Sequence, residues 1–216
     1  MTARPRGTSS AMKLVLVRHG TTDWNESGRL MGRLDIALNE RGQRQAEAAA
    51  RALQGFQPEA IVASPQRRAQ QTAAAIAATV GTAVTLDDNL AEVGVGAWEG
   101  RPWAELQNDP DVAAYLSDPL YPCAAVEPCT AVRDRMVAAV TAWRQRAGDA
   151  GTLVFVSHGD PLRILAAHCM GLDVAHHRRL EIAPGSLSVV DAPAGHGGRV
   201  LLLNFQPTDG LQRVLA

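Results

Sequence analysis

Two histidines follow short apolar segments of the sequence, and a glycine follows each of them directly. His19 comes after residues 14–17, and His158 comes after residues 152–156. Short apolar runs are typical of strands in a parallel sheet, whose carboxyl ends share the edge at which ligands bind. If these strands are neighbours, the two imidazoles face each other there and can serve as nucleophile or acid–base groups. Two ordinary loop histidines are the alternative.

Arginines add positive charge to the same edge. Arg18 directly precedes the first histidine, and Arg68 lies in the segment SPQRRAQQTA. In this segment Ser64 is the expected N-cap and Pro65 the first residue of a helix that runs to about Val80. Free N–H groups at the start of a helix favour anions. The pattern therefore predicts an anion site, with a surface position for Arg68 as the alternative.

The elements that must position these residues alternate along the chain. Strands are expected at 14–17, 60–63, 82–86, 152–156, 186–190 and 200–205, and helices at 40–54, 65–80, 127–147 and 161–170. This alternation predicts an α/β fold, a three-layer α/β/α sandwich with a mostly parallel central sheet. The proline-rich excursion around 100–128, with short helices at 103–107 and 112–116, is expected to form a lid over the sheet edge.

The composition indicates a globular protein. The chain has 216 residues, of which 46% are hydrophobic and 20% charged, and its formal net charge is −1. Such a chain buries a substantial core, and it has no global field that attracts nucleic acid or an anionic membrane. No apolar run approaches the roughly 20 residues of a membrane span, and the opening residues lack the apolar core of a secretory signal. We expect a disordered tail at 1–11 and a single domain at 12–216.

The cysteines and the remaining histidines indicate no disulfide framework and no metal site. The chain has three cysteines and no CxxC pair. We therefore expect reduced thiols in a cytoplasmic protein, with a Cys123–Cys129 disulfide as the alternative. His168, His176 and His177 lack ligand spacing with carboxylates, so no metal or other cofactor is expected. His176 and His177 are predicted to lie in a solvated turn.

Five segments in order resemble the histidine phosphatase superfamily, and within it the phosphoglycerate-mutase-like branch. They are LVRHG, GRLDIALNERGQRQA, SPQRRAQQTA, LAEVGVGAWEG and VSHGDPLRIL, and they span nearly all of residues 13–170. The resemblance implies the three-layer α/β/α fold, a phosphohistidine intermediate and catalysis without a metal. It also implies a small phosphorylated metabolite as the substrate.

The resemblance assigns roles to individual residues. His19 corresponds to the nucleophile, and Glu92 corresponds to the proton donor, although a solvated turn carboxylate is its simpler interpretation. The residues expected to bind the phosphoryl group are Arg18, Asn25, Arg68, His158 and Gly159. Guanidinium groups suit this task because each grips two phosphate oxygens, and their charge disfavours protonation of a neighbouring imidazole.

One segment departs from the family pattern. Where the family usually shows a Gly-Glu-Ser run before a long helix, this chain has AVEPCTAVRDR. Glu127 corresponds to the glutamate and Pro128 replaces the serine, so the role of this segment stays open.

The residues favour one activity over two alternatives. The expected function is hydrolysis of a phosphomonoester. A cofactor-dependent phosphoglycerate mutase is the first alternative, and a phospho-ligand-binding module without turnover is the second. The segment GVGAWEGRPW resembles the phosphatase version, whereas the mutases are longer between the proton donor and the second histidine. The expected catalytic positions are all occupied, which disfavours the inactive module.

Overall fold

The computed structural model of the chain describes residues 12–123, 126–148, 151–192 and 198–207. This part of the chain contains a six-stranded sheet in the order β3-β2-β4-β1-β5-β6. The strands are β1 (Met12–Arg18), β2 (Ala60–Ala63), β3 (Val84–Leu86), β4 (Thr152–Ser157), β5 (Leu187–Ala192) and β6 (Arg199–Phe205). The first four are parallel to one another, while β5 and β6 are antiparallel to their neighbours. The predicted mostly parallel sheet is confirmed.

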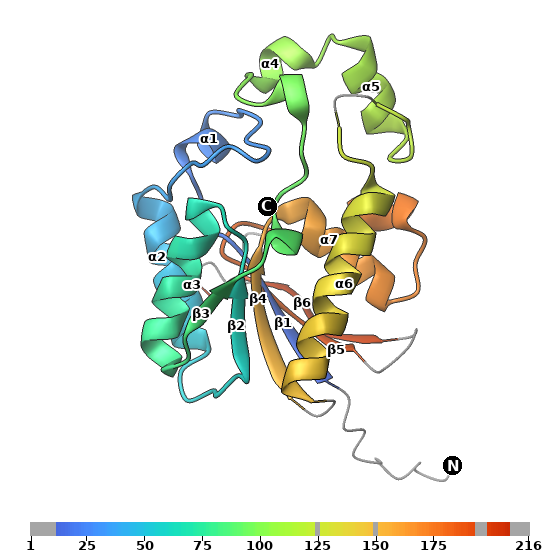
Figure 1. Cartoon of the computed structure of the whole chain (residues 1–216). Coiled ribbons are helices and arrows are strands. Elements are labelled where there is room, and N and C mark those ends of the chain that lie inside the picture. The colour runs from blue at the N-terminus through green and yellow to red at the C-terminus, as the bar shows by residue number, and fades with distance from the viewer. Residues whose placement is uncertain (1–11, 124–125, 149–150, 193–197, 208–216) are drawn as a thin grey trace, which may run out of the picture.

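Helices cover both faces of this sheet. They are α1 (Asp23–Glu26), α2 (Glu40–Ala52), α3 (Arg67–Val80), α4 (Trp103–Leu106), α5 (Pro110–Ser117), α6 (Cys129–Ala147) and α7 (Gly159–Cys169). Figure 1 shows α2 and α3 on one face and α6 and α7 on the other, which is the predicted three-layer sandwich. Short 3₁₀ helices lie at Asp88–Leu90, Gly96–Trp98 and Val174–Arg179.

The central strand β1 shows why the sheet is buried on both faces. Val15 and Val17 belong to the apolar cluster that contains residues of α2 and α3. Leu14 and Leu16 belong to the second cluster, with residues of α6 and α7. Successive side chains of a strand point to opposite faces, so burial on both sides requires a continuous apolar run.

Four helices begin at residues other than those the sequence predicts, and one of them is α5, which begins at Pro110 rather than at residue 112. α3 begins at Arg67 rather than at Pro65, and its N-cap Gln66 makes no side-chain cap hydrogen bond. The predicted N-cap role of Ser64 is wrong because its hydroxyl group lies 2.7 Å from Nε2 of His158. α6 begins at Cys129, two residues after the predicted start. α7 begins at Gly159 rather than at Pro161, directly after the second histidine.

The excursion around 100–128 and the C-terminal strands contain the predicted elements. Figure 1 shows α4 and α5 beyond the end of the sheet at which β1 and β4 stop. The two predicted C-terminal strands, β5 and β6, form an antiparallel pair. The predicted tail at 1–11 lies outside the described residues.

Several smaller expectations are also decided. All three cysteines are free, so the alternative Cys123–Cys129 disulfide is wrong. His176 is exposed, but His177 is buried and its Nδ1 lies 2.7 Å from the Val174 carbonyl oxygen. The predicted solvated position is therefore wrong for His177, because its ring closes a 3₁₀ turn.

No helix in the described ranges is long and apolar enough to cross a membrane. These ranges also hold no group of three or more His, Cys, Asp and Glu side chains arranged for a metal.

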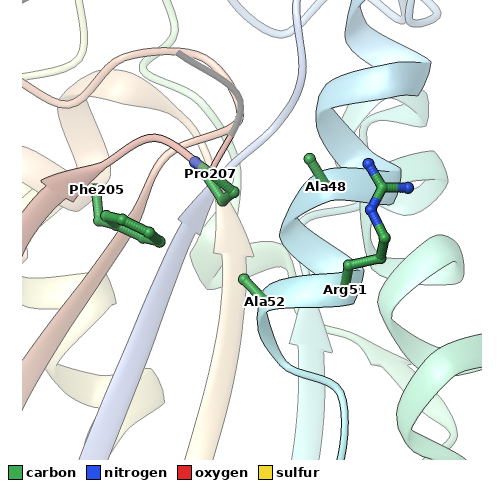
Figure 2. A pocket seen from close by; sticks show the side chains of 5 residues that line it. All are labelled: Ala48, Arg51, Ala52, Phe205 and Pro207. Carbon is green, nitrogen blue, oxygen red and sulfur yellow. The ribbon is translucent and has the colours of Figure 1, made fainter. Parts of the chain in front are cut away.

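A cavity of about 530 Å³ lies between α2 and the end of β6 (Figure 2). Its lining consists of Ala48, Arg51, Ala52, Phe205 and Pro207. None of the predicted site residues lines this cavity, so the chemistry must be sought at the carboxyl ends of β1 and β4.

Candidate active site

The two histidines meet at the carboxyl ends of neighbouring strands. β1 and β4 are parallel, with Arg18 opposite Ser157. The residues that directly follow the two strands are therefore His19 and His158. Their ring centres are 5.0 Å apart, with an angle of 61° between the planes. Both side chains are fully buried. The strand-end pattern predicted this juxtaposition, and the alternative of two ordinary loop histidines is wrong.

The hydrogen bonds of His19 define which ring nitrogen is free. Nδ1 lies 2.7 Å from the carbonyl oxygen of Gly20, so Nδ1 carries the proton and donates it. Nε2 is buried and has no hydrogen-bond partner in the described part of the chain. Burial lowers the pKa of His19 well below its usual value, and the charges of Arg68 and Arg18 lower it further. A neutral imidazole with an open lone pair is a nucleophile.

The glycines beside the histidines make room for backbone and for a cation. A Cβ at Gly20 would collide with the backbone of Gly42 in α2, so glycine is required for this close packing. A Cβ at Gly159 would lie 3.3 Å from the guanidinium carbon of Arg18. The space at Gly159, which the sequence suggested for a ligand, therefore accommodates the Arg18 side chain.

The two arginines are fixed by main-chain carbonyl groups. Arg68 is fully buried and donates to the carbonyl oxygens of Leu34 at 2.7 Å and Gly32 at 2.9 Å. Arg18 donates to the carbonyl oxygen of Ile182 at 2.7 Å. Its Nε–H group is buried and has no partner among the described residues. A buried cationic donor without an acceptor is costly, so this geometry favours an anionic ligand beside Arg18.

His158 has the opposite tautomer to His19. Its Nδ1 accepts from Nε–H of Arg68 at 3.2 Å, so Nε2 carries the proton. Nε2 lies 2.7 Å from the Ser64 hydroxyl and 2.9 Å from Oε1 of Gln66. Burial lowers the pKa of His158 well below its usual value, and the charges of Arg68 and Arg18 lower it further. Sequence reasoning missed Ser64 and Gln66 as site residues, although they directly follow β2 and therefore lie at the same sheet edge.

Glu92 lies next to this pair of histidines. Its Oε2 atom is 3.9 Å from Nδ1 of His158, and Oε1 accepts from the N–H group of Val93 at 2.9 Å. The side chain is 17% exposed, so its simpler interpretation as a solvated turn carboxylate is wrong. Burial and the negative charge of Asp160 raise the pKa of Glu92 to about 7, although Arg68 lowers it. A carboxyl group with this pKa both gives and takes a proton near neutral pH.

Asn25 lies at the cap of α1. Its Oδ1 atom accepts from the backbone N–H of Thr22 at 3.0 Å and from the Thr22 hydroxyl at 3.1 Å. No hydrogen bond or ion pair joins Asn25 to the other predicted site residues in the described ranges. The structure thus brings together Arg18, His19, Arg68, Glu92 and His158, while the role of Asn25 stays a prediction.

The buried imidazoles make folding stability dependent on pH, and this gives a first prediction. The pKa of His19 is lower in the folded than in the unfolded chain, so below pH 6.5 the unfolded chain binds more protons. The contribution of His19 to stability is therefore lost as the pH falls from 6.5 towards the folded pKa. We expect His19→Asn to reduce the slope of unfolding free energy against pH by up to about 1.4 kcal/mol per pH unit. Urea unfolding between pH 5 and 6.5 measures it. The exposed His176→Asn control should leave the slope unchanged, and an unchanged slope in His19→Asn would contradict the prediction.

In this three-layer α/β/α sandwich, two imidazoles and two guanidiniums gather where β1 and β4 end, which defines a class of proteins able to hold an anion beside a histidine. The sequence model of the histidine phosphatase superfamily (branch 1) matches residues 14–206. The chain belongs to this family.

Its relatives include both a phosphatase and a mutase. Glucosyl-3-phosphoglycerate phosphatase of Mycobacterium tuberculosis is 35% identical over 175 residues, which cover 77% of this chain and 78% of the relative. The 2,3-bisphosphoglycerate-dependent phosphoglycerate mutase of Thermoplasma acidophilum is 30% identical over 203 residues, 93% and 96% of the two chains. Among solved structures, Bacillus stearothermophilus YhfR matches with a TM-score of 0.83 and 28% identity, over 90% of this chain and 97% of that chain.

Proposed function

We propose that this protein is a phosphomonoesterase that hydrolyses a small phosphorylated metabolite through a phosphohistidine at His19. The observation that carries the proposal is a pair of buried, unpartnered atoms on adjacent residues at the end of β1, Nε2 of His19 and the Nε–H group of Arg18. Nε2 of His19 can attack phosphorus with its lone pair, and the Nε–H group of Arg18 can donate a hydrogen bond to a phosphoryl oxygen. The family membership and the relatives named as phosphatases support the same chemistry.

The first half of the reaction transfers the phosphoryl group to the protein. Nε2 of His19 attacks phosphorus in line with the ester oxygen, a nitrogen–phosphorus bond forms and the phosphorus–oxygen bond breaks. The leaving alkoxide takes the proton of the Glu92 carboxyl group. Arg18 and Arg68 stabilise the charge on the equatorial oxygens, and His158 donates no proton to the leaving group because its own proton lies between Ser64 and Gln66.

The second half returns the protein to its starting state. Water attacks the phosphorus of phospho-His19, and the Glu92 carboxylate takes the proton that this water loses. The nitrogen–phosphorus bond breaks, inorganic phosphate leaves and Nε2 regains its lone pair. In this scheme Asn25 contacts the bound phosphate, and Gly159 contributes by leaving space for Arg18.

The same proposal covers the domain organisation and the cellular location. Residues 12–216 form one domain, and the excursion around 100–128 acts as a lid through α4 and α5, which lie beyond the active edge of the sheet (Figure 1). Tyr115 of α5 packs against Trp98, with 5.9 Å between ring centres, which ties the lid to the segment after Glu92. Free cysteines support a cytoplasmic location.

The test is release of inorganic phosphate from a panel of phosphorylated metabolites by the purified protein, without added metal. We expect hydrolysis of at least one alkyl phosphate and accumulation of an acid-labile phosphate on the protein after rapid quenching. The variant for comparison with the wild-type protein is Arg68→Met. It removes one proposed phosphoryl contact and should therefore lower kcat/KM by about 10²–10³-fold. No release from any substrate on a broad panel would contradict the proposal.

The mutase relative supports a second candidate function, phosphoglycerate mutase. A mutase returns the phosphoryl group to a bound product and therefore excludes water. Incubation with 3-phosphoglycerate, with and without 2,3-bisphosphoglycerate, separates the two functions. Phosphate release that does not depend on the bisphosphate indicates a phosphatase, and isomerisation that requires it indicates a mutase.

A further inference from the structure

Two arginines hold the backbone of Glu92 through its carbonyl group. The carbonyl oxygen of Glu92 accepts from Nε of Arg33 and from a terminal nitrogen of Arg135, each at 3.3 Å. Arg135 also donates to the carbonyl oxygen of Asn89 at 2.6 Å. The loop that carries Glu92 is thus fixed at two successive points by one side chain of α6.

Glu127 completes this arrangement by binding both arginines. Its two carboxylate oxygens accept from Arg135 at 2.9 and 3.1 Å, and one of them also accepts from Arg33 at 3.2 Å. The N–H group of Gly94 donates to the same carboxylate at 3.3 Å, and the N–H group of Glu127 donates to the Gly94 carbonyl at 2.8 Å. The Glu92 loop is therefore fixed on both sides of residue 92.

The charges of this network fix the Glu92 loop and leave the Glu92 carboxyl group able to stay protonated. Arg135 and Glu127 are only 13% and 17% exposed, so neither would be stable there without the other. Burial raises the pKa of Glu127, but the hydrogen bonds and charge of Arg135 outweigh it, and the pKa lies below its usual value. The arginines contact the carbonyl group of Glu92 rather than its carboxylate, so the carboxyl group is free to carry its proton.

We propose that Arg135 and Glu127 are positioning residues for the proton donor, which act by fixing the backbone of Glu92. This inference rests on the proposed function, because it assigns a purpose to the proton that Glu92 gives to the leaving group. It also answers the question raised by the segment AVEPCTAVRDR. Glu127 keeps a defined task there, although Pro128 occupies the N-cap position of α6.

The test compares two esters that differ in their need for a proton. The alkoxide of glycerol phosphate must be protonated as it leaves, whereas nitrophenolate leaves para-nitrophenyl phosphate unaided. Only the first ester needs a proton as the phosphoryl group passes to His19, and kcat/KM reports this step without the later hydrolysis of phospho-His19. We expect Arg135→Met to lower kcat/KM for glycerol phosphate by about 10²-fold and kcat/KM for para-nitrophenyl phosphate by about fivefold or less. Glu127→Gln should likewise lower the ratio of kcat/KM for glycerol phosphate to kcat/KM for para-nitrophenyl phosphate. Arg135→Lys should restore part of this ratio.

The controls separate positioning from a purely structural role. Arg133→Met removes an arginine of the same helix that, among the described residues, pairs with its neighbour Asp134, and it should leave both rates unchanged. Arg33 is half exposed, so Arg33→Met is expected to fold even if Arg135→Met does not, and it should shift the ratio by about tenfold. An equal loss for both esters in Arg135→Met and Glu127→Gln would overturn this proposal, and so would an unchanged ratio in Arg33→Met if Arg135→Met does not fold. A wild-type protein that releases no phosphate would overturn the proposed function instead.

Discussion

Replacing His19 with alanine is expected to abolish turnover of every phosphomonoester. The substitution removes the open Nε2 atom, and with it the covalent intermediate, while Arg18 and Arg68 remain. Loss of a nucleophile that acts together with its partner groups lowers kcat by about 10⁵–10⁶-fold in comparable covalent mechanisms. Rapid quenching in alkaline denaturant, which preserves phosphohistidine, should detect protein-bound phosphate in the wild-type protein and none in the His19→Ala variant.

Binding measurements keep this result separate from unfolding. The phosphoryl contacts do not depend on His19, so inorganic phosphate at about 100 times its Kd should still stabilise His19→Ala by about 2.7 kcal/mol. The matched control is His176→Ala, an exposed histidine, which should keep full activity. Substantial turnover by a folded His19→Ala protein would rule out phosphotransfer to this residue.

Much of the scaffold is predictable from the sequence because its signals are local. The apolar run of β1 indicates a strand covered on both faces, and the structure buries Leu16 and Val17 on opposite sides. The helix predicted at 40–54 begins at residue 40, where the side chain of Asn39 caps it by accepting from the N–H of Gly42 at 2.9 Å. The strand-end histidines were placed correctly because parallel strands necessarily bring their carboxyl ends to one edge.

The supports of the site could not be predicted, because they connect residues distant in the sequence. The carbonyl groups that fix Arg68 belong to a loop more than thirty positions away, as the separations of 34 and 36 residues show. A carbonyl group is present in every residue, so no side-chain pattern identifies these partners. The role of Ser64 was mistaken for the same reason. A Ser-Pro pair predicts a helix start, but the hydroxyl group bonds to His158, 94 positions along the chain.

The proton donor depends even more on the folded structure. A glutamate in a turn usually remains solvated, and the sequence around Glu92 shows no burial signal by itself. Only the packed structure places Asp160 close enough to raise the pKa of Glu92, in addition to the effect of burial. The sequence can therefore identify which residue is acidic, but the fold determines the pH at which it gives up its proton.

Replacing Glu92 with glutamine is expected to slow the release of alkyl leaving groups severely. The amide has nearly the shape of the protonated carboxyl group, but it cannot give its proton to the leaving oxygen. Loss of a general acid lowers the rate by about 10²–10⁴-fold. We expect this loss in kcat/KM for glycerol phosphate and a much smaller loss in kcat/KM for para-nitrophenyl phosphate, because kcat/KM does not include the later hydrolysis of phospho-His19. A comparable loss for both esters would contradict the role of Glu92 as proton donor.

The pH dependence of the two proteins gives the sharper comparison. The pKa of Glu92 is about 7, so kcat/KM of the wild-type protein for the alkyl ester should decrease tenfold per pH unit above about 7, as the carboxyl group loses its proton. Glu92→Gln should lose this decrease, because nothing at position 92 then titrates.

The same substitution should affect stability in the opposite direction to activity. Because the folded protein holds a proton on Glu92 that the unfolded chain releases above its usual pKa of 4.5, wild-type stability decreases as the pH rises towards 7. Urea unfolding at pH 8 should therefore show Glu92→Gln to be more stable than the wild-type protein, and a less stable variant would show that the carboxyl group is not strained by its buried position.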